Sequence, residues 1–231
     1  MLANLPPPSP RARRSGFTLV EIMAVMAVIA ILLSVAAVGI QNISGGQATT
    51  TAVSVTEALF DEARSAAVGR GTRARLLIHK NLDDNDSLDR NRYLTYMCVA
   101  ALETDPNGAV LNDQWNVITR GTPLPAGVYF SAEESQEASQ RAGVGSWSEM
   151  NIALPGSQQS KECYYYEFNA EGVCVNEQQD AKSGASVILV GGARPKDASE
   201  PLMRKNNKAG FVIWRNGRTS LYRDPKQIDE Q

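Results

Sequence analysis

The sequence predicts an α+β fold, in which one long N-terminal helix precedes a domain of antiparallel strands. Three observations carry this prediction. Residues 17–40 form a continuous apolar run, residues 47–68 repeat apolar side chains at helical spacing, and residues 71–231 alternate short β-like runs with turn residues. We therefore divide the chain into a leader (1–16), a helix (17–70) and a β-rich domain (71–231).

The apolar run from Phe17 to Ile40 contains 24 residues and a single charged side chain, Glu21. As a helix it would extend about 36 Å, enough to cross a hydrocarbon core of about 30 Å. A carboxylate at the centre of a bilayer costs about 2.5–3.5 kcal/mol, so it needs a reason to be there. Cleavage between Gly16 and Phe17 would create an α-ammonium group of the right sign to meet Glu21. The pattern predicts a helix that leaves lipid and packs against copies of itself.

Two other interpretations of this run explain less of it. A secretory signal peptide has a shorter apolar core followed by a small-residue cleavage site, and the sequence from Val38 onward offers none. An ordinary single-span anchor explains the basic residues before the run through cytoplasm-in topology. It explains neither the Gly16-Phe17 pair nor Glu21. We therefore treat residues 17–40 as a transmembrane segment that is also an assembly surface.

Residues 47–68 continue the helix with an amphipathic pattern. One face collects apolar side chains at spacings of three and four, namely Val53, Leu59, Phe60, Ala63, Ala66 and Ala67. We expect a sheet to cover this face. Gly69-Arg70-Gly71 then supplies a stop, because glycine tolerates the left-handed conformation that often ends a helix.

Ten short runs after residue 71 have β-like composition. They are Ala74–His79, Arg92–Leu102, Trp115–Thr119, Val128–Ser131, Met150–Ala153, Cys163–Phe168, Val173–Asn176, Ser186–Val190, Gly210–Trp214 and Thr219–Tyr222. Asn216-Gly217 predicts a hairpin with a two-residue type I′ turn. The polar segments 133–145 and 194–208 are predicted to be exposed loops, the first with room for a short helical turn.

The N-terminal segment resembles the class III signal of type IV pilins and of type II secretion pseudopilins. That family has a basic leader, a glycine before the cleavage site, a phenylalanine after it and a glutamate at the fifth mature position. The matching residues here are Arg13-Arg14-Ser15-Gly16 and Phe17-Thr18-Leu19-Val20-Glu21. The resemblance implies that prepilin peptidase removes residues 1–16 and methylates the Phe17 amino group, and that Glu21 guides the subunit into a helical filament. It also implies a single-pass inner-membrane protein with its C-terminal domain in the periplasm.

Later segments are similar to H-type pseudopilins and FimT-like minor pilins. They are residues 60–78, at the junction of helix and first strand, and residues 167–172 and 210–219 near the end. This resemblance implies two sheets in the β domain. It also implies a minor pseudopilin of a type II secretion system, or of a type IV pilus-like filament, with other pilin or pseudopilin subunits as partners. The alternatives are a DNA-binding minor pilin for DNA uptake and an adhesive pilus-tip subunit that uses residues 133–145 and 194–208.

Charge and cysteine content narrow the function further. The chain has 23 basic and 25 acidic residues, and loss of the three leader arginines leaves 20 against 25, a net charge of −5. Broad nucleic-acid affinity needs a basic stripe that releases counterions, so this balance argues against it. Cys98, Cys163 and Cys174 would face an oxidising periplasm. Their odd number leaves at least one free or paired between chains, and the pairing stays open.

The sequence has no nucleophile elbow, P-loop or dinucleotide fingerprint, so we expect neither an enzyme nor a cofactor. Asp83–Asp89 contains four carboxylates but lacks the glycine and the terminal glutamate of an EF-hand loop. We predict a solvated loop there and no metal site. His79, the sole histidine, is predicted to end a strand, and Cys98 to lie in the core.

A basic patch near the C-terminus is the candidate nucleic-acid contact. It contains Arg215, Arg218 and Arg223, with Lys226. FimT-like pilins that bind DNA are similar in carrying a Gly-Arg-x-Arg element, but the second arginine of that element is Ser220 here. Acidic residues follow the patch, so the pattern favours an exposed hairpin of mixed charge, with DNA contact as the alternative.

Overall fold

The computed structural model describes residues 19–83, 85–105, 110–157, 159–175, 182–195, 198–222 and 227, without the side chains of residues 33–45, 110–113 and 205. The chain divides into two compact units, residues 1–43 and residues 44–231. We describe each unit by itself. The predicted cleavage residues Gly16 and Phe17 lie outside the described residues.

Helix α1 (Leu19–Arg70) has 52 residues and ends where the sequence predicts. Gly71 has a φ of +63°, the left-handed conformation that glycine adopts without strain. Its amide donates to the Val68 carbonyl at 3.2 Å, and the Thr72 amide donates to the Ala67 carbonyl at 3.1 Å. These two bonds form a Schellman motif, which satisfies the last carbonyls of the helix.

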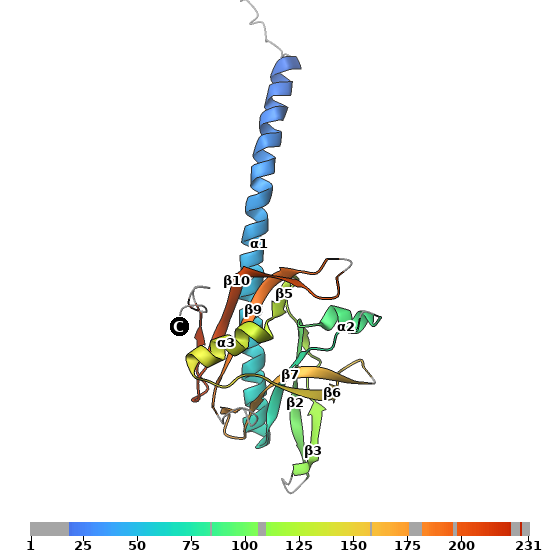
Figure 1. The fold of residues 1–231 in the computed structure, drawn as a ribbon, viewed down its shortest axis with the longest axis vertical. Coiled ribbons are helices and arrows are strands. Elements are labelled where there is room, and N and C mark those ends of the chain that lie inside the picture. The colour runs from blue at the N-terminus through green and yellow to red at the C-terminus, as the bar shows by residue number, and fades with distance from the viewer. Residues whose placement is uncertain are drawn as a thin grey trace, which may run out of the picture. The chain divides into compact units, whose positions relative to one another are not determined.

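Residues 71–222 form two antiparallel sheets, as predicted (Figure 1). The seven-stranded sheet A has the order β3-β2-β1-β7-β6, with β4 paired to β2 and β8 to β7. The four-stranded sheet B has the order β11-β10-β9-β5. The strands are β1 (Ala74–His79), β2 (Tyr96–Thr104), β3 (Val110–Val117), β4 (Thr122–Pro123), β5 (Val128–Phe130), β6 (Ser148–Ala153), β7 (Ser160–Phe168), β8 (Cys174–Val175), β9 (Ala185–Ala193), β10 (Leu202–Ile213) and β11 (Thr219–Leu221). The α+β prediction is confirmed.

Residues 44–70 of α1 pack across both sheets, and Phe60 is the centre of this contact. Its ring lies 5.1 Å from that of Tyr166 and 6.1 Å from that of Phe168 in sheet A, and 5.4 Å from that of Phe211 in sheet B. The predicted apolar face is buried at Val53, Leu59, Phe60, Ala63 and Ala67. A single helix therefore joins the two sheets into one core.

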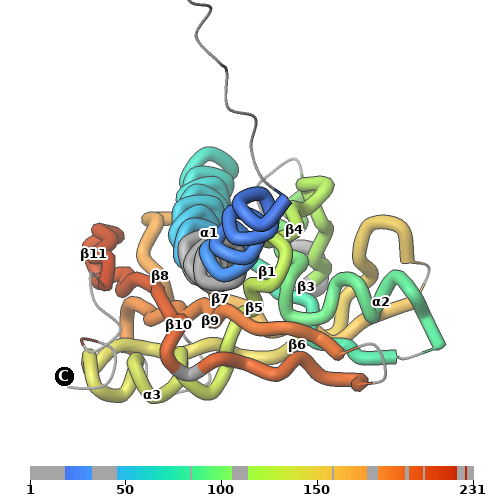
Figure 2. Tube along the Cα trace, turned by 90° about the horizontal axis from the view of Figure 1, so that it is seen from above, coloured from blue at the N-terminus to red at the C-terminus, as the bar shows by residue number. Residues whose placement is uncertain are grey.

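Sheet B is covered on both faces. Val187 and Leu189 face the core that contains α1, whereas Ile188 and Val190 pack with Ala138 of helix α3 (Ala132–Ala142). This alternation is the two-residue period of a strand. Figure 2 shows α3 on the side of β9 and β10 away from α1.

Helix α3 corrects the prediction of an exposed loop at residues 133–145. Ser131 caps its N-terminus by accepting the Glu134 amide, and Gly143 ends it at a φ of +68°. Its buried side chains are Ser135, Ala138 and Ser139. The face that packs on β9 therefore consists of small, mostly polar side chains. The sequence of this segment shows no repeat of apolar residues, so it does not predict a helix.

Two further predictions are wrong in detail. Residues 194–208 were predicted as a loop, but β10 begins at Leu202 and pairs with β9, with a register shift between Met203 and Lys208. At the β10–β11 hairpin, the Gly217 amide donates to the Trp214 carbonyl at 2.8 Å, and the Trp214 amide to the Arg218 carbonyl at 2.9 Å. Gly217 has a positive φ whereas Asn216 does not. The connection is therefore a three-residue loop with glycine in the left-handed position, not a type I′ turn.

Candidate functional site

The first described turns of α1 carry apolar side chains on every face of the helix. Between Leu19 and Leu32, the exposed fractions of the large apolar side chains range from 44% at Ile29 to 76% at Leu19. A helix that is apolar all round is normally buried in protein or in lipid. This part of the chain therefore requires a partner outside the described residues of its own chain.

Glu21 is the acidic side chain in the first turn of α1, and it is exposed. A negative charge in the first turn of a helix is favourable, because the unpaired amides there carry partial positive charge. It is also four residues after Phe17, so that a new amino group at Phe17 and the Glu21 carboxylate would share one face of a continued helix. The described part of the chain has no helix long and apolar enough to cross a membrane. The predicted span 17–40 lies in part outside the described residues.

Comparison with known proteins bears on this segment alone. Residues 11–37 match the family model of the prokaryotic N-terminal methylation motif. No curated protein and no solved structure matches the chain. The matched residues include Gly16, Phe17 and Glu21.

The chain is thus a type IV pilin-like protein, with the N-terminal methylation motif of the pilin and pseudopilin family. The motif implies processing by prepilin peptidase, anchoring in the inner membrane through the N-terminal helix before assembly, and assembly with pilins. Subunits of this family are generally structural and not enzymes.

The C-terminal basic patch is only partly described. Arg215 and Arg218 are exposed at the β10–β11 hairpin, and Arg223 lies outside the described residues. Arg64 of α1 donates from Nη1 to the Gly217 carbonyl at 3.3 Å, which adds a third guanidinium group beside the hairpin. Glu57 of α1 accepts from the Thr219 hydroxyl. The surroundings of the hairpin therefore have mixed charge, whereas the acidic residues on which the sequence prediction rests lie outside the described residues.

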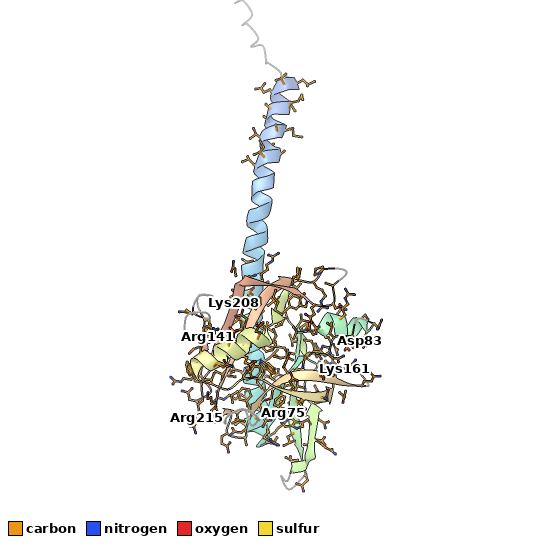
Figure 3. The ribbon with its side chains drawn as sticks, in the orientation of Figure 1. Arg75, Asp83, Arg141, Lys161, Lys208 and Arg215 are labelled. Atoms are coloured by element: carbon orange, nitrogen blue, oxygen red, sulfur yellow. The ribbon has the colours of Figure 1, made fainter. Side chains whose placement is uncertain are left out.

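In the acidic segment Asp83 and Asn85 are exposed and outside any helix, as predicted for a solvated loop, but the residues from Ser87 onward correct that prediction. Residues Ser87–Arg92 form helix α2, capped by Asp86, whose side chain accepts the Leu88 amide at 2.9 Å. Asp89 is buried, and its carboxylate accepts from Lys161 Nζ of β7 at 2.6 Å. His79 Nε2 at the end of β1 lies 3.2 Å from the other Asp89 oxygen. Figure 3 labels Asp83 and Lys161 in this region.

We refer to Asp89, Lys161 and His79 as the buried latch, because they join α2, β7 and β1. Burial lowers the pKa of His79, and Asp89 offsets part of that effect. The hydrogen bond to Asp89 raises the pKa of Lys161. His79 is therefore neutral at pH 7, with Lys161 as the cation that pairs with Asp89. No group of histidine, cysteine and acidic side chains in the described part of the chain could hold a metal ion.

All three cysteines are buried, and none forms a disulfide. Burial raises the pKa of Cys98 to about 12 and that of Cys174 to about 12, and it also raises the pKa of Cys163. Thiolate is the reactive form of cysteine, so burial of these thiols disfavours their oxidation. The prediction that Cys98 lies in the core is confirmed.

Proposed function

We propose that the chain is a minor pseudopilin of a type II secretion system or a minor subunit of a type IV pilus-like filament. In this proposal prepilin peptidase cuts between Gly16 and Phe17, and the mature helix waits in the inner membrane with its β domain in the periplasm. The observation that carries the proposal is the apolar helix surface at residues 19–32, preceded by the methylation motif. The resemblance of residues 60–78 to H-type pseudopilins supports the minor-subunit role.

Assembly then follows from the charge placement. In lipid, the Glu21 carboxylate is unfavourable, and so is an isolated α-ammonium group on Phe17. In a bundle of helices each carboxylate can meet the amino group of a neighbouring subunit. Two charges that are both costly to bury alone become a pair, and leaving either without its partner is strongly unfavourable. The apolar side chains around Glu21 pack against those of the neighbours. The work of the protein is mechanical, and it needs no catalytic residue.

Comparing the secreted proteins of a strain that lacks this gene with those of its parent tests the role. We expect secreted enzymes to accumulate in the periplasm if the filament is a secretion pseudopilus. Unchanged secretion together with loss of surface pili would assign the chain to a true pilus. If neither changes, the proposal is wrong. A Gly16→Ala variant provides a processing control, because it should retain the leader and migrate as a heavier band.

A second candidate function, DNA binding for uptake, is favoured by the three arginines Arg64, Arg215 and Arg218 around one hairpin. Glu57 and the absence of the second arginine of the FimT-like element oppose it. A gel shift with double-stranded DNA across a salt series tests it. If the candidate is right, Arg215→Gln with Arg218→Gln should lower the salt slope by about 2, since each phosphate contact contributes about one unit. The adhesive-tip subunit stays as a third alternative, in which α3 and the start of β10 would lie in the segments that bind a surface.

A further inference from the structure

The start of β10 exposes apolar side chains. Among the described residues of the unit 44–231, Leu202 has the largest exposed fraction of any large apolar side chain, 67%, and the adjacent Met203 is 36% exposed. Their cross-strand partners on β9 are Ala193 and Gly192, which have too little side chain to cover them. The pairing with β9 therefore leaves both side chains uncovered, and β11 does not reach them, because it pairs with β10 only at Phe211–Ile213.

The charges of the same segment are all of one sign. Residues 202–208 contain three basic side chains and no acidic one, and the exposed Glu200 lies two residues before Leu202. Arg204 is exposed, whereas Lys208 is buried and pairs with Glu134 of α3, with Nζ to Oε2 at 3.0 Å. Exposed leucine and methionine can enter the headgroup region of a bilayer, and an adjacent exposed arginine favours anionic lipid. The apolar groups enter the headgroup region, and the guanidinium group meets phosphate.

The fold places this segment beside the beginning of its own unit. Thr49 of α1 donates from Oγ1 to the Asn207 side-chain oxygen at 3.1 Å. Thr49 is nine residues after Ile40, the end of the apolar run. Figure 3 labels Lys208 close to one end of the unit and Arg215 farther from that end. Asn207, in the first half of β10, therefore lies near the beginning of the unit 44–231, the part of the unit that follows the apolar run in sequence.

We propose that Leu202, Met203 and Arg204 form a lipid-contacting patch, which docks the β domain on an anionic bilayer surface while the helix is held in the membrane. The inference rests on the proposed function, since it needs the membrane-held state. Docking would hold the β domain in one orientation before assembly. Extraction into a filament would release it.

The test uses the full chain with a fluorescent probe at position 203, introduced as Met203→Cys. The native cysteines are buried, so an unsubstituted chain should take up almost no label. A matched control carries the probe at Val68→Cys, because Val68 is 52% exposed and lies at the other end of the helix segment 44–70. The chains are reconstituted into vesicles of phosphatidylcholine and phosphatidylglycerol that contain a headgroup-level quencher, and flotation reports whether each chain is held by the membrane.

We expect the probe at 203 to be quenched and the probe at 68 to remain bright. Arg204→Gln should lower the docked-to-undocked ratio about fivefold, because a basic residue near an anionic surface contributes on the order of 1 kcal/mol. Floating chains with equal quenching at both positions would overturn the patch and leave the proposed function intact. Chains that do not float would contradict the membrane-held state itself. Shielding of position 203 only after other pilin subunits are added would make the patch a protein contact, and would also overturn the inference.

Discussion

Helix α1 contains two segments with opposite relations to the rest of the chain. Between Leu19 and Leu32 the large apolar side chains are exposed on all faces. Between Ser44 and Arg70 most apolar side chains occupy one face, which is buried against two sheets, and Val68 is an exposed exception. The backbone conformation is the same in both segments, so the difference lies in the side-chain pattern alone.

The two segments therefore contribute to different processes, the second to folding of the β domain and the first to assembly. The second segment finds its partners within its own chain, so substitutions there should change the stability of the β domain. The first segment must find its partners elsewhere, in lipid or in other subunits. Substitutions there should change assembly and leave the stability of the β domain unchanged. The predictions below test this separation, from the largest expected effect to the smallest.

Phe60→Ala should lower the free energy of unfolding of the β domain by about 3–5 kcal/mol, because it leaves a cavity where Tyr166, Phe168 and Phe211 meet. Ile29→Ala is the matched control in the first segment, and it should leave that free energy unchanged. Chemical denaturation followed by the fluorescence of the β domain measures both. Equal destabilisation by the two variants would break the distinction between the segments.

Asp89→Ala should destabilise the β domain by about 3 kcal/mol, because it removes the acceptor of a buried ion pair. Asp83 is an exposed carboxylate of the same acidic segment, and Asp83→Ala should stay within about 0.5 kcal/mol of the unsubstituted chain. The same denaturation experiment compares them. A small effect at both positions would mean that the acidic segment is a solvated loop after all.

A smaller effect is expected from the titration of His79. Burial lowers its pKa below the ordinary value of 6.5, so the unfolded chain binds a proton more readily than the folded one. The free energy of unfolding should therefore fall as the pH drops below about 6.5, and His79 should contribute no pH dependence well above that value. His79→Gln should show a flatter dependence between about pH 7.5 and pH 5. Parallel curves for the two proteins would contradict the assignment.

The sequence predicts those elements whose side-chain pattern is regular. The apolar face of residues 47–68, the glycine stop at Gly71 and a run within every strand except β4 follow from local periodicity and turn chemistry. It does not predict α3, because the buried residues Ser135 and Ser139 bond to backbone and not to an apolar layer. Their hydroxyls accept the amides of Ile188 at 2.8 Å and Ser186 at 3.1 Å.

The buried latch is missed for a different reason. An acidic run reads as solvated because its neighbours in sequence are polar, whereas its partner Lys161 is 72 residues away. The sequence alone does not pair the lysine of a strand with a distant run of aspartates, because only the fold brings them together. The N-terminal site has the reverse character. Its residues are contiguous, so the sequence identifies Gly16, Phe17 and Glu21 without any tertiary contact.

The most direct measurement of the central claim is the incorporation of a Glu21→Gln variant into filaments, relative to a Glu62→Gln control on the second segment. Both carboxylates are exposed in the single chain. Both variants should lose the leader normally, as seen on a gel. In sheared filaments the Glu21 variant should be depleted roughly tenfold or more, since an ammonium group left unpaired in a helix bundle is strongly unfavourable. The Glu62 variant should be present at its normal level. Normal incorporation of both variants would contradict the account.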